Sequence, residues 1–259
     1  MNQPLISYRE SPMPQYTWLE GIISIEAALR AGSREVAAIY VQRDRWTGNI
    51  LRLRKTAESA GISWEQVKRD FIEERASGAS HGGVIALAGP RRFTTMEQLV
   101  SDKERPLVVM LDGIEDPFNF GQAVRALYSA GADGLVVRPR NWLSAAGIVA
   151  RSSAGASELM PMAVAESAEE AADFYRRRSL IVACTTRKAS VSIYQADLSI
   201  PLFLLLGGEK RGITRSFVDK ADLRLQIPYR RPFPQSLGAA ASAAIIAFEI
   251  MRQRMTVGL

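Results

Sequence analysis

The sequence predicts an α/β protein in which a smaller amino-terminal α/β domain precedes a larger carboxyl-terminal domain built on a parallel sheet. Beyond residue 106, short apolar runs alternate with helical patterns, which is typical of parallel strands covered on both faces. Before residue 89, strands and helices alternate in a unit of their own, and the intervening segment is polar and bounded by prolines. We therefore expect domains at 1–92 and 106–259, joined by a linker at 93–105.

The elements of the amino-terminal unit follow in order. Residues 19–30 have helical spacing, and 36–41 predict a buried strand. A second helix is expected over 49–60, ending at Gly61, before a short apolar segment and a charged stretch that reaches Arg75. A glycine-rich turn at 78–83 precedes an apolar strand at 84–88, so His81 is interpreted as a turn residue.

The carboxyl-terminal part contains five apolar runs that predict strands, at 107–111, 134–137, 180–183, 202–206 and 223–227. The chain closes with a helix over 236–251 that is rich in small residues and apolar on nearly all sides, so we expect it to be buried. The single cysteine, Cys184, follows one of the apolar runs and is interpreted as a core residue.

Composition narrows the classes of function. The 259 residues carry a net charge of +6, which favours an anionic partner. A nucleic-acid phosphate backbone is preferred to a membrane surface as that partner. One histidine and one cysteine exclude a zinc site or a Cys–His pair, and the phosphate-binding and dinucleotide-binding glycine motifs are absent. No segment has the pattern of a signal peptide or a membrane span. We expect a cytoplasmic protein that binds neither metal nor membrane.

Three segments that follow predicted strands carry polar or glycine-rich sequence, and ligands bind at the carboxyl ends of parallel strands. In the first, Asn119 is expected to cap a helix, Gly121 to leave room for a ligand, and Arg125 to supply a cation for phosphate or alkoxide. An ordinary capped helix with a surface arginine fits this segment equally well.

The second segment pairs Gly207 with Gly208, which lets the backbone approach a ligand, and Glu209 adds a negative charge. A tight strand-to-helix turn is the alternative. The third sets Arg230 and Arg231 among aromatic residues and prolines, as in a stiff loop that contacts nucleic acid, or in a solvated basic loop. Its last polar residue, Ser236, is expected to cap the final helix.

In order and position, these segments resemble the three motifs of the SpoU (TrmH-like) RNA 2′-O-methyltransferases of the SPOUT superfamily, over residues 107–254. The amino-terminal unit resembles their L30e-like substrate-binding domain. The resemblance implies a trefoil-knotted catalytic domain, a homodimer and S-adenosylmethionine as cofactor. It implies catalytic roles for Arg125, Asn119, Glu209 and Ser236. The implied cofactor-binding residues are Thr185, Leu206, Gly207, Gly208, Gly212, Ile227 and Leu237, and the implied RNA-binding residues are Arg230, Arg231 and Glu158.

One departure from the family pattern concerns the third motif, where Gly238 stands in place of the usual asparagine and the preceding loop is about one residue longer. The resemblance favours 23S ribosomal RNA as substrate over transfer RNA. Two other interpretations remain: a catalytically weakened relative that binds cofactor or RNA as a ribosome-associated factor, and an unrelated α/β enzyme acting on a small phosphorylated substrate.

Overall fold

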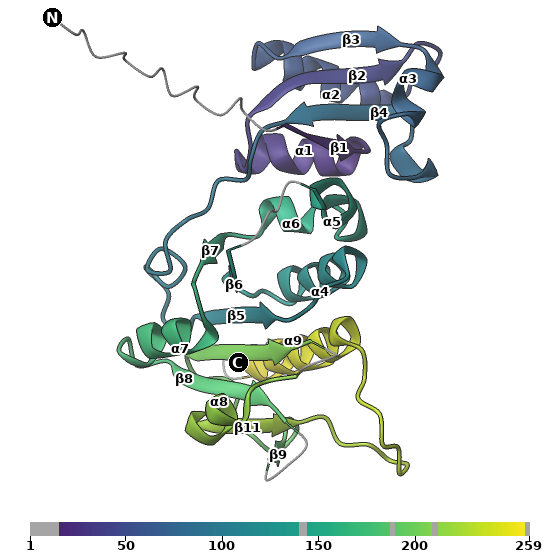
Figure 1. The fold of residues 1–259 in the computed structure, drawn as a ribbon. Coiled ribbons are helices and arrows are strands. Elements are labelled where there is room, and N and C mark those ends of the chain that lie inside the picture. Colours follow the sequence, from purple (N-terminus) through teal and green to yellow (C-terminus); the bar gives the residue numbers. More distant parts are fainter. Residues whose placement is uncertain (1–15, 140–143, 187–189, 209–211, 257–259) are drawn as a thin grey trace, which may run out of the picture.

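The structure is a computed structural model that describes residues 16–139, 144–186, 190–208 and 212–256. It contains two sheets that follow one another along the chain, one of four strands and one of seven. Figure 1 shows the four-stranded unit at one end of the molecule and the larger unit at the other. The predicted α/β class, with a parallel sheet in the carboxyl-terminal part and a smaller amino-terminal unit, is confirmed.

The amino-terminal sheet has the strand order β1-β4-β2-β3, with β2 and β3 parallel and the β1–β4 and β2–β4 pairs antiparallel. Its elements are β1 (Thr17–Glu20), α1 (Ile22–Ala31), β2 (Val36–Gln42), α2 (Gly48–Ser59), β3 (Ser63–Val67), α3 (Arg69–Glu73), a 3₁₀ turn (Ala79–His81) and β4 (Val84–Ala88).

The predicted start of the first helix, at residue 19, is wrong, because α1 begins at Ile22. Leu19 lies in β1, opposite Ala86 of β4, and Gly21 separates the strand from α1 with φ of 80°. Pairing with a distant strand therefore overrides the local helical spacing. His81 lies in a turn, where its Nδ1 accepts a hydrogen bond from the amide of Gly83 at 3.0 Å, so its expected role is confirmed.

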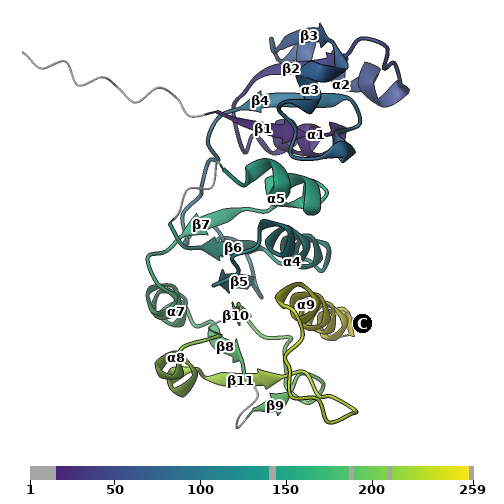
Figure 2. The ribbon, with the colours of Figure 1, turned by 45° about the vertical axis from the view of Figure 1, so that its right-hand side comes forward.

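The carboxyl-terminal sheet has the order β7-β6-β5-β10-β8-β11-β9, and every neighbouring pair is parallel. Figure 2 shows α4 and α9 on one face and α7 and α8 on the other. The elements are β5 (Leu107–Asp112), α4 (Pro117–Ser129), β6 (Gly134–Val137), α5 (Ala146–Ser152), α6 (Ala156–Leu159), β7 (Met162–Val164), α7 (Ala168–Arg176), β8 (Ile181–Thr185), β9 (Val191–Ser192), β10 (Leu202–Gly207), α8 (Arg215–Lys220), β11 (Leu223–Gln226) and α9 (Ala239–Thr256).

The last helix differs from the expectation in two ways. It begins at Ala239, so Ser236 lies outside it and does not cap it. It also buries only one face, since Ala241 and Phe248 are exposed while Ala243 and Ile246 are buried. The outer face of the helix is also apolar, because it carries small residues such as Ala241, but this face is exposed in the single chain.

The segment expected as a linker packs against the carboxyl-terminal sheet. Thr94 forms a parallel bridge with Ala163, and the hydroxyl of Tyr175 donates a hydrogen bond to the carbonyl of Met96 at 3.0 Å. Leu99 is 2% exposed within the core on the α7 side of the sheet. Much of this segment is therefore held by the second unit.

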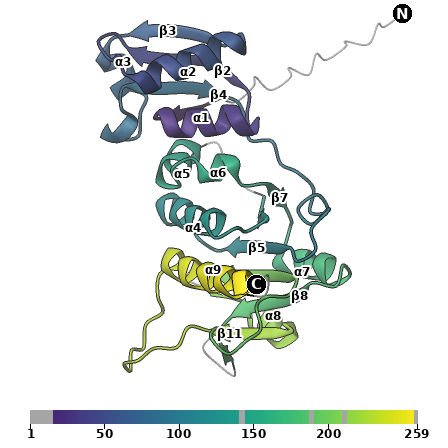
Figure 3. The same ribbon diagram turned by 180° about the vertical axis from the view of Figure 1, so that it is seen from behind.

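The two units meet in a close-packed interface between β1 and α1 on one side and α5 and α6 on the other (Figure 3). A Cβ atom on Gly147 would lie 2.5 Å from the carbonyl oxygen of Trp18, and one on Gly155 would lie 2.8 Å from the Cβ of Ala27. Ala150 of α5 is buried in the amino-terminal core. Glycine at these positions allows the backbones of the two units to approach.

Candidate cofactor pocket and RNA-facing loops

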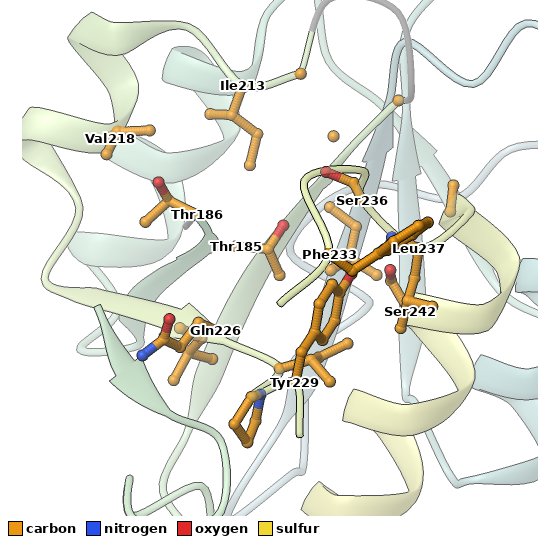
Figure 4. Close-up of a pocket in the computed structure, with 18 of the residues that line it drawn as sticks. Thr185, Thr186, Ile213, Val218, Gln226, Tyr229, Phe233, Ser236, Leu237 and Ser242 are labelled. Atoms are coloured by element: carbon orange, nitrogen blue, oxygen red, sulfur yellow. The ribbon is translucent and has the colours of Figure 1, made fainter. Parts of the chain in front are cut away.

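A pocket of about 670 Å³ opens at the carboxyl-terminal edge of the seven-stranded sheet (Figure 4). It is bounded by the ends of β8, β10 and β11, by the segment before α8, and by the loop between β11 and α9. The lining residues are Thr185, Thr186, Leu206, Gly207, Gly208, Gly212, Ile213, Val218, Leu225, Gln226, Ile227, Pro228, Tyr229, Arg230, Arg231, Pro232, Phe233, Ser236, Leu237, Ala239 and Ser242.

The glycine pair at the end of β10 is required by close backbone contacts. The amide of Gly208 donates to the carbonyl of Asp112 at 2.7 Å, and a Cβ on Gly208 would lie 1.9 Å from the carbonyl oxygen of Gly113. A Cβ on Gly207 would lie 2.7 Å from Cγ1 of Ile213. Without side chains at these two positions, the backbone itself forms one wall of the pocket.

The loop between β11 and α9 forms the opposite wall and is tied at its two ends. The hydroxyl of Tyr229 accepts a hydrogen bond from the amide of Leu237 at 2.9 Å. The rings of Tyr229 and Phe233 have centroids 6.5 Å apart, and Figure 4 shows both rings beside the pocket. Arg230 and Arg231 are exposed on the same loop. The wall therefore combines aromatic rings with two cations.

The structure brings together most of the residues expected to bind the cofactor or RNA. All seven expected cofactor residues line the pocket, and Ser236, Arg230 and Arg231 line it as well. Glu209 lies outside the described residues. Several lining residues lacked a sequence signal, because they are ordinary apolar, hydroxyl or amide side chains outside the motifs. They are Thr186, Ile213, Val218, Gln226 and Ser242.

Arg125 lies elsewhere in the described structure. It is exposed on α4 and lines a second, open hollow with Gln122 and Ser129 of α4 and with Ala244 and Phe248 of α9. It does not line the first pocket. The residue expected at the reacting hydroxyl and the residues expected around the cofactor are thus on different surfaces of one chain.

Two expectations about the start of α4 are wrong. Asp116, rather than Asn119, caps the helix, because its carboxylate accepts from the amide of Phe118 at 2.8 Å and the helix begins at Pro117. Gly121 leaves no room for a ligand, since a Cβ there would lie 1.9 Å from Oγ of Ser152 in α5. Gly121 instead allows α4 and α5 to pack closely.

The structure also corrects the expectation that Glu158 contacts RNA. Its side chain is 1% exposed, and its Oε2 accepts hydrogen bonds from Oγ of Ser33 at 2.6 Å and Nε of Arg34 at 3.0 Å. Nη1 of Arg91 lies 3.5 Å from the same oxygen. Glu158 therefore joins the two units from inside their interface.

This buried charge cluster has perturbed pKa values. Burial raises the pKa of Glu158, but Arg34, Arg91 and the Ser33 hydroxyl outweigh it, so the pKa lies below its ordinary value. Burial lowers the pKa of Arg91 to about 10, which leaves its guanidinium cationic at neutral pH. A second ion pair crosses the interface, with Nη1 of Arg151 at 2.7 Å from Oε2 of the buried Glu20.

Neither a metal site nor a membrane span is found in the part of the chain that the structure describes. No group of three or more His, Cys, Asp or Glu side chains is placed to hold a metal ion among those residues. Within the same ranges, the helices are too short or too polar to cross a bilayer.

Comparison with known sequences identifies the family. The SpoU rRNA Methylase family matches residues 106–248, more than half of the chain, and the RNA 2′-O ribose methyltransferase substrate binding family matches residues 18–94. The chain therefore belongs to the SpoU rRNA Methylase family.

Two curated relatives match the chain over nearly their full length. The chain is 28% identical to 23S rRNA (guanosine-2′-O-)-methyltransferase RlmB of Haemophilus influenzae, over 91% of this chain and 97% of the relative. For RlmB of Pseudomonas aeruginosa, the identity is 28%, over 93% and 98%.

A crystal structure of an RNA 2′-O ribose methyltransferase aligns with a TM-score of 0.76 and 25% identity, covering 93% of this chain and 90% of that one. The SpoU methyltransferase AviRb from Streptomyces viridochromogenes, in complex with AdoMet, shares the fold with a TM-score of 0.78 at 21% identity, covering 93% and 91%.

Proposed function

We propose that this protein transfers a methyl group from S-adenosylmethionine to a ribose 2′-hydroxyl of structured RNA, with 23S ribosomal RNA as the favoured substrate. One observation carries the proposal: a single pocket gathers all seven expected cofactor residues, in a chain that belongs to the SpoU rRNA Methylase family. The names of the curated relatives support ribosomal RNA over transfer RNA.

The pocket suits this cofactor in size and chemistry. Its volume of about 670 Å³ lies in the range of small-molecule sites. Leu206, Ile227 and Leu237 supply apolar contacts, and the absence of side chains at the glycine pair lets an adenine or the methionine part approach the backbone closely. When bound, S-adenosylmethionine supplies a methyl carbon attached to a cationic sulfur. A pocket sheltered from water favours a reaction in which a cation and a developing alkoxide become neutral.

Arg125 is the proposed catalytic residue at the reacting hydroxyl. A guanidinium does not lose its proton in a protein, so Arg125 acts by donating a charge-assisted hydrogen bond to the developing alkoxide. The proton passes to an RNA phosphate or to water. Asn119, Glu209 and Ser236 are proposed to organise the site around the ribose.

A second copy of the chain is needed to complete the site. Arg125 does not line the cofactor pocket of its own chain but a hollow between α4 and α9, and Phe118 of α4 and Phe248 of α9 are about half exposed. An apolar surface of this kind is typical of a protein interface. We propose a homodimer that covers this surface and delivers Arg125 of one subunit to the pocket of its partner.

The remaining parts of the proposal follow from the family and the substrate. The carboxyl-terminal domain is proposed to contain the trefoil knot of SPOUT enzymes, and the domains to extend over 1–92 and 106–259. Arg230 and Arg231 contact the RNA backbone beside the pocket. A ribosomal RNA substrate places the reaction in the cytoplasm.

Calorimetric titration with S-adenosylmethionine, beside a tritiated-methyl transfer assay on ribosomal and transfer RNA that lack the modification, tests the function. Binding with transfer to ribosomal RNA is the expected result. Transfer only to transfer RNA would contradict the substrate assignment. Binding without transfer to any RNA would favour the weakened relative and contradict catalysis, and the absence of binding would contradict the cofactor assignment.

Mixing two inactive variants tests the shared site. Arg125→Ala removes the cation, and Leu237→Trp fills the pocket; calorimetry on the latter establishes that cofactor binding is lost. If Arg125 acts across the dimer, a mixed dimer regains one complete site, made of the pocket of the first variant and the arginine of the second. Activity that stays absent in verified mixed dimers would show that Arg125 acts within its own chain.

A further inference from the structure

The loop between β2 and α2, residues 43–47, presents an unusual set of side chains to solvent. Trp46 is 46% exposed, and Arg43 and Arg45 on the same loop are exposed as well. Nearly half of this large side chain remains in water, so much of its apolar surface is not used in folding. The loop is thus a candidate contact surface rather than a part of the core.

The backbone of this loop is nevertheless fixed. The amide of Arg43 donates to the carbonyl of Val67 at 3.0 Å, and the amide of Arg45 donates to the carbonyl of Gln42 at 3.1 Å. At its end, the hydroxyl of Thr47 accepts from the amide of Ile50 and caps α2. The exposed side chains therefore stand on a defined backbone conformation, which lowers the entropy cost of binding.

The glycine-rich turn at 78–83 packs against the loop. Gly83 has φ of 78°, and a Cβ there would lie 3.2 Å from Cγ of Arg45 and 3.2 Å from Oε1 of Gln42. The aliphatic part of Arg45 thus packs on the glycine while the residue as a whole remains exposed.

The two loop arginines differ from most other arginines of the same domain. Arg52, Arg54, Arg69 and Arg75 each lie within 3.2 Å of a glutamate. Arg43 and Arg45 form no salt bridge with any carboxylate among the described residues, including Asp44 between them in the sequence. Two cations without carboxylate partners beside an exposed indole match the chemistry of single-stranded nucleic acid, which offers phosphates and the flat face of a base.

The β2–α2 connection and the loop between β11 and α9 lie on the same side of the molecule in all three ribbon views (Figures 1, 2 and 3). This arrangement allows one extended RNA to contact both loops.

We propose that an unpaired nucleotide of the substrate RNA stacks its base on Trp46 while Arg43 and Arg45 contact the adjoining phosphates. This inference rests on the proposed RNA substrate and adds a second contact point, on the amino-terminal domain. The substrate is then recognised by a flipped-out or single-stranded base as well as by the nucleotide that is methylated.

The test measures binding of an unmodified 23S ribosomal RNA transcript, separately from methyl transfer. Trp46→Ala should weaken RNA binding roughly 10-fold or more, since base–aromatic stacking contributes on that scale. Trp46→Phe should retain most of the affinity because it keeps a flat ring. Both variants should bind S-adenosylmethionine and melt as the wild type does. Wild-type RNA affinity in Trp46→Ala would overturn the inference.

Salt dependence tests the arginines. The double variant Arg43→Ala/Arg45→Ala should reduce the slope of log affinity against log salt by about 1.4, which corresponds to two phosphate contacts on a single strand. The matched control Arg52→Ala/Arg54→Ala removes the same charge from paired positions and should leave the slope nearly unchanged. Equal losses in both double variants would overturn the assignment, since they would show that net charge alone matters.

The readouts separate this inference from the proposed function. If the wild type transfers no methyl group to any RNA while the Trp46 and arginine variants lose RNA binding as expected, the function fails and the contact stands. If the wild type is active and Trp46→Ala has an unchanged KM for RNA, the contact fails and the function stands.

Discussion

Replacing Glu158 with glutamine should loosen the joint between the two domains. The carboxylate is 1% exposed, accepts hydrogen bonds from Ser33 and Arg34, and forms an ion pair with Arg91 at 3.5 Å. Glutamine keeps the shape of the side chain but removes the only negative charge that the two guanidiniums contact in the described cluster. Removing one partner of a buried ion pair costs about 3–5 kcal/mol, and the retained amide oxygen places this variant near the lower value.

The expected effect can be stated as a melting temperature. In a chain of this size each kcal/mol corresponds to roughly 2–4 °C, so a loss of about 3 kcal/mol lowers Tm by about 6–12 °C. Calorimetric melting measures it, and hydrogen exchange should show lost protection in α1 and α6. The control Glu26→Gln breaks the exposed pair with Arg52 and should cost less than about 1 kcal/mol. Equal Tm values for Glu158→Gln and wild type would refute this role of Glu158 in joining the two domains.

The same cluster predicts a pH dependence. The folded-state pKa of Glu158 lies below its ordinary 4.5 because the two arginines and the Ser33 hydroxyl outweigh burial. A depressed carboxyl pKa stabilises the fold fully above the ordinary value and loses this contribution as pH falls through the folded value. The stability difference between wild type and Glu158→Gln should thus stay constant from about pH 6 to 8 and shrink below pH 4.5. A difference that grows in acid would contradict this account.

Three further substitutions or modifications probe the pocket and the core. Gly208→Ala should abolish cofactor binding in calorimetry, because its Cβ would lie 1.9 Å from the carbonyl oxygen of Gly113. Unaltered binding would show that the backbone of the pocket wall can shift to accept the methyl group. Tyr229→Phe should weaken cofactor binding about fivefold, because the Leu237 amide loses a hydrogen-bond acceptor worth about 1 kcal/mol. An unchanged Kd would show that this hydrogen bond does not hold the pocket loop in its binding conformation. Burial raises the pKa of the Cys184 thiol to about 11, so iodoacetamide at neutral pH should modify it only after unfolding, as mass spectrometry would detect; rapid labelling of the native protein would contradict its burial.

The fold was predictable where local sequence and final environment agree. The run 84–88 became β4 residue for residue, because a continuous apolar stretch suits a central strand. Leu19 shows the limit: its neighbours have helical spacing, but pairing with Ala86, far along the chain, makes it a strand residue. The strands β7 and β9 contain three and two residues, too few for any pattern, and exist through hydrogen bonds to their neighbours.

The site divides in the same way. Gly207 and Gly208 were predictable because a glycine pair directly after a strand is visible in the sequence. The contact that excludes a side chain at Gly208 was not, since it comes from Gly113, far away in the chain. The role of Glu158 was hidden, since its partners Ser33 and Arg34 lie 125 and 124 positions away in sequence. Asn119 was mistaken for a helix cap because the nearby Asp116, followed by proline, offers the same chemistry three residues earlier.

The position of Arg125 outside the first pocket fits the charge of the proposed cofactor. S-adenosylmethionine carries a sulfonium cation, and two unit charges about 4 Å apart repel by about 4 kcal/mol at the effective dielectric near a protein surface. A guanidinium held beside the sulfonium would therefore oppose cofactor binding before RNA arrives. Arg230 and Arg231 on the pocket loop are exposed, so water screens their charges. In the proposed homodimer, Arg125 on α4 of one subunit meets the reacting atoms at the pocket of its partner, where RNA phosphates offset its charge. Arg125→Ala should thus abolish turnover while leaving cofactor affinity unchanged or slightly stronger, and weakened cofactor binding would place the arginine beside the sulfonium in the free enzyme.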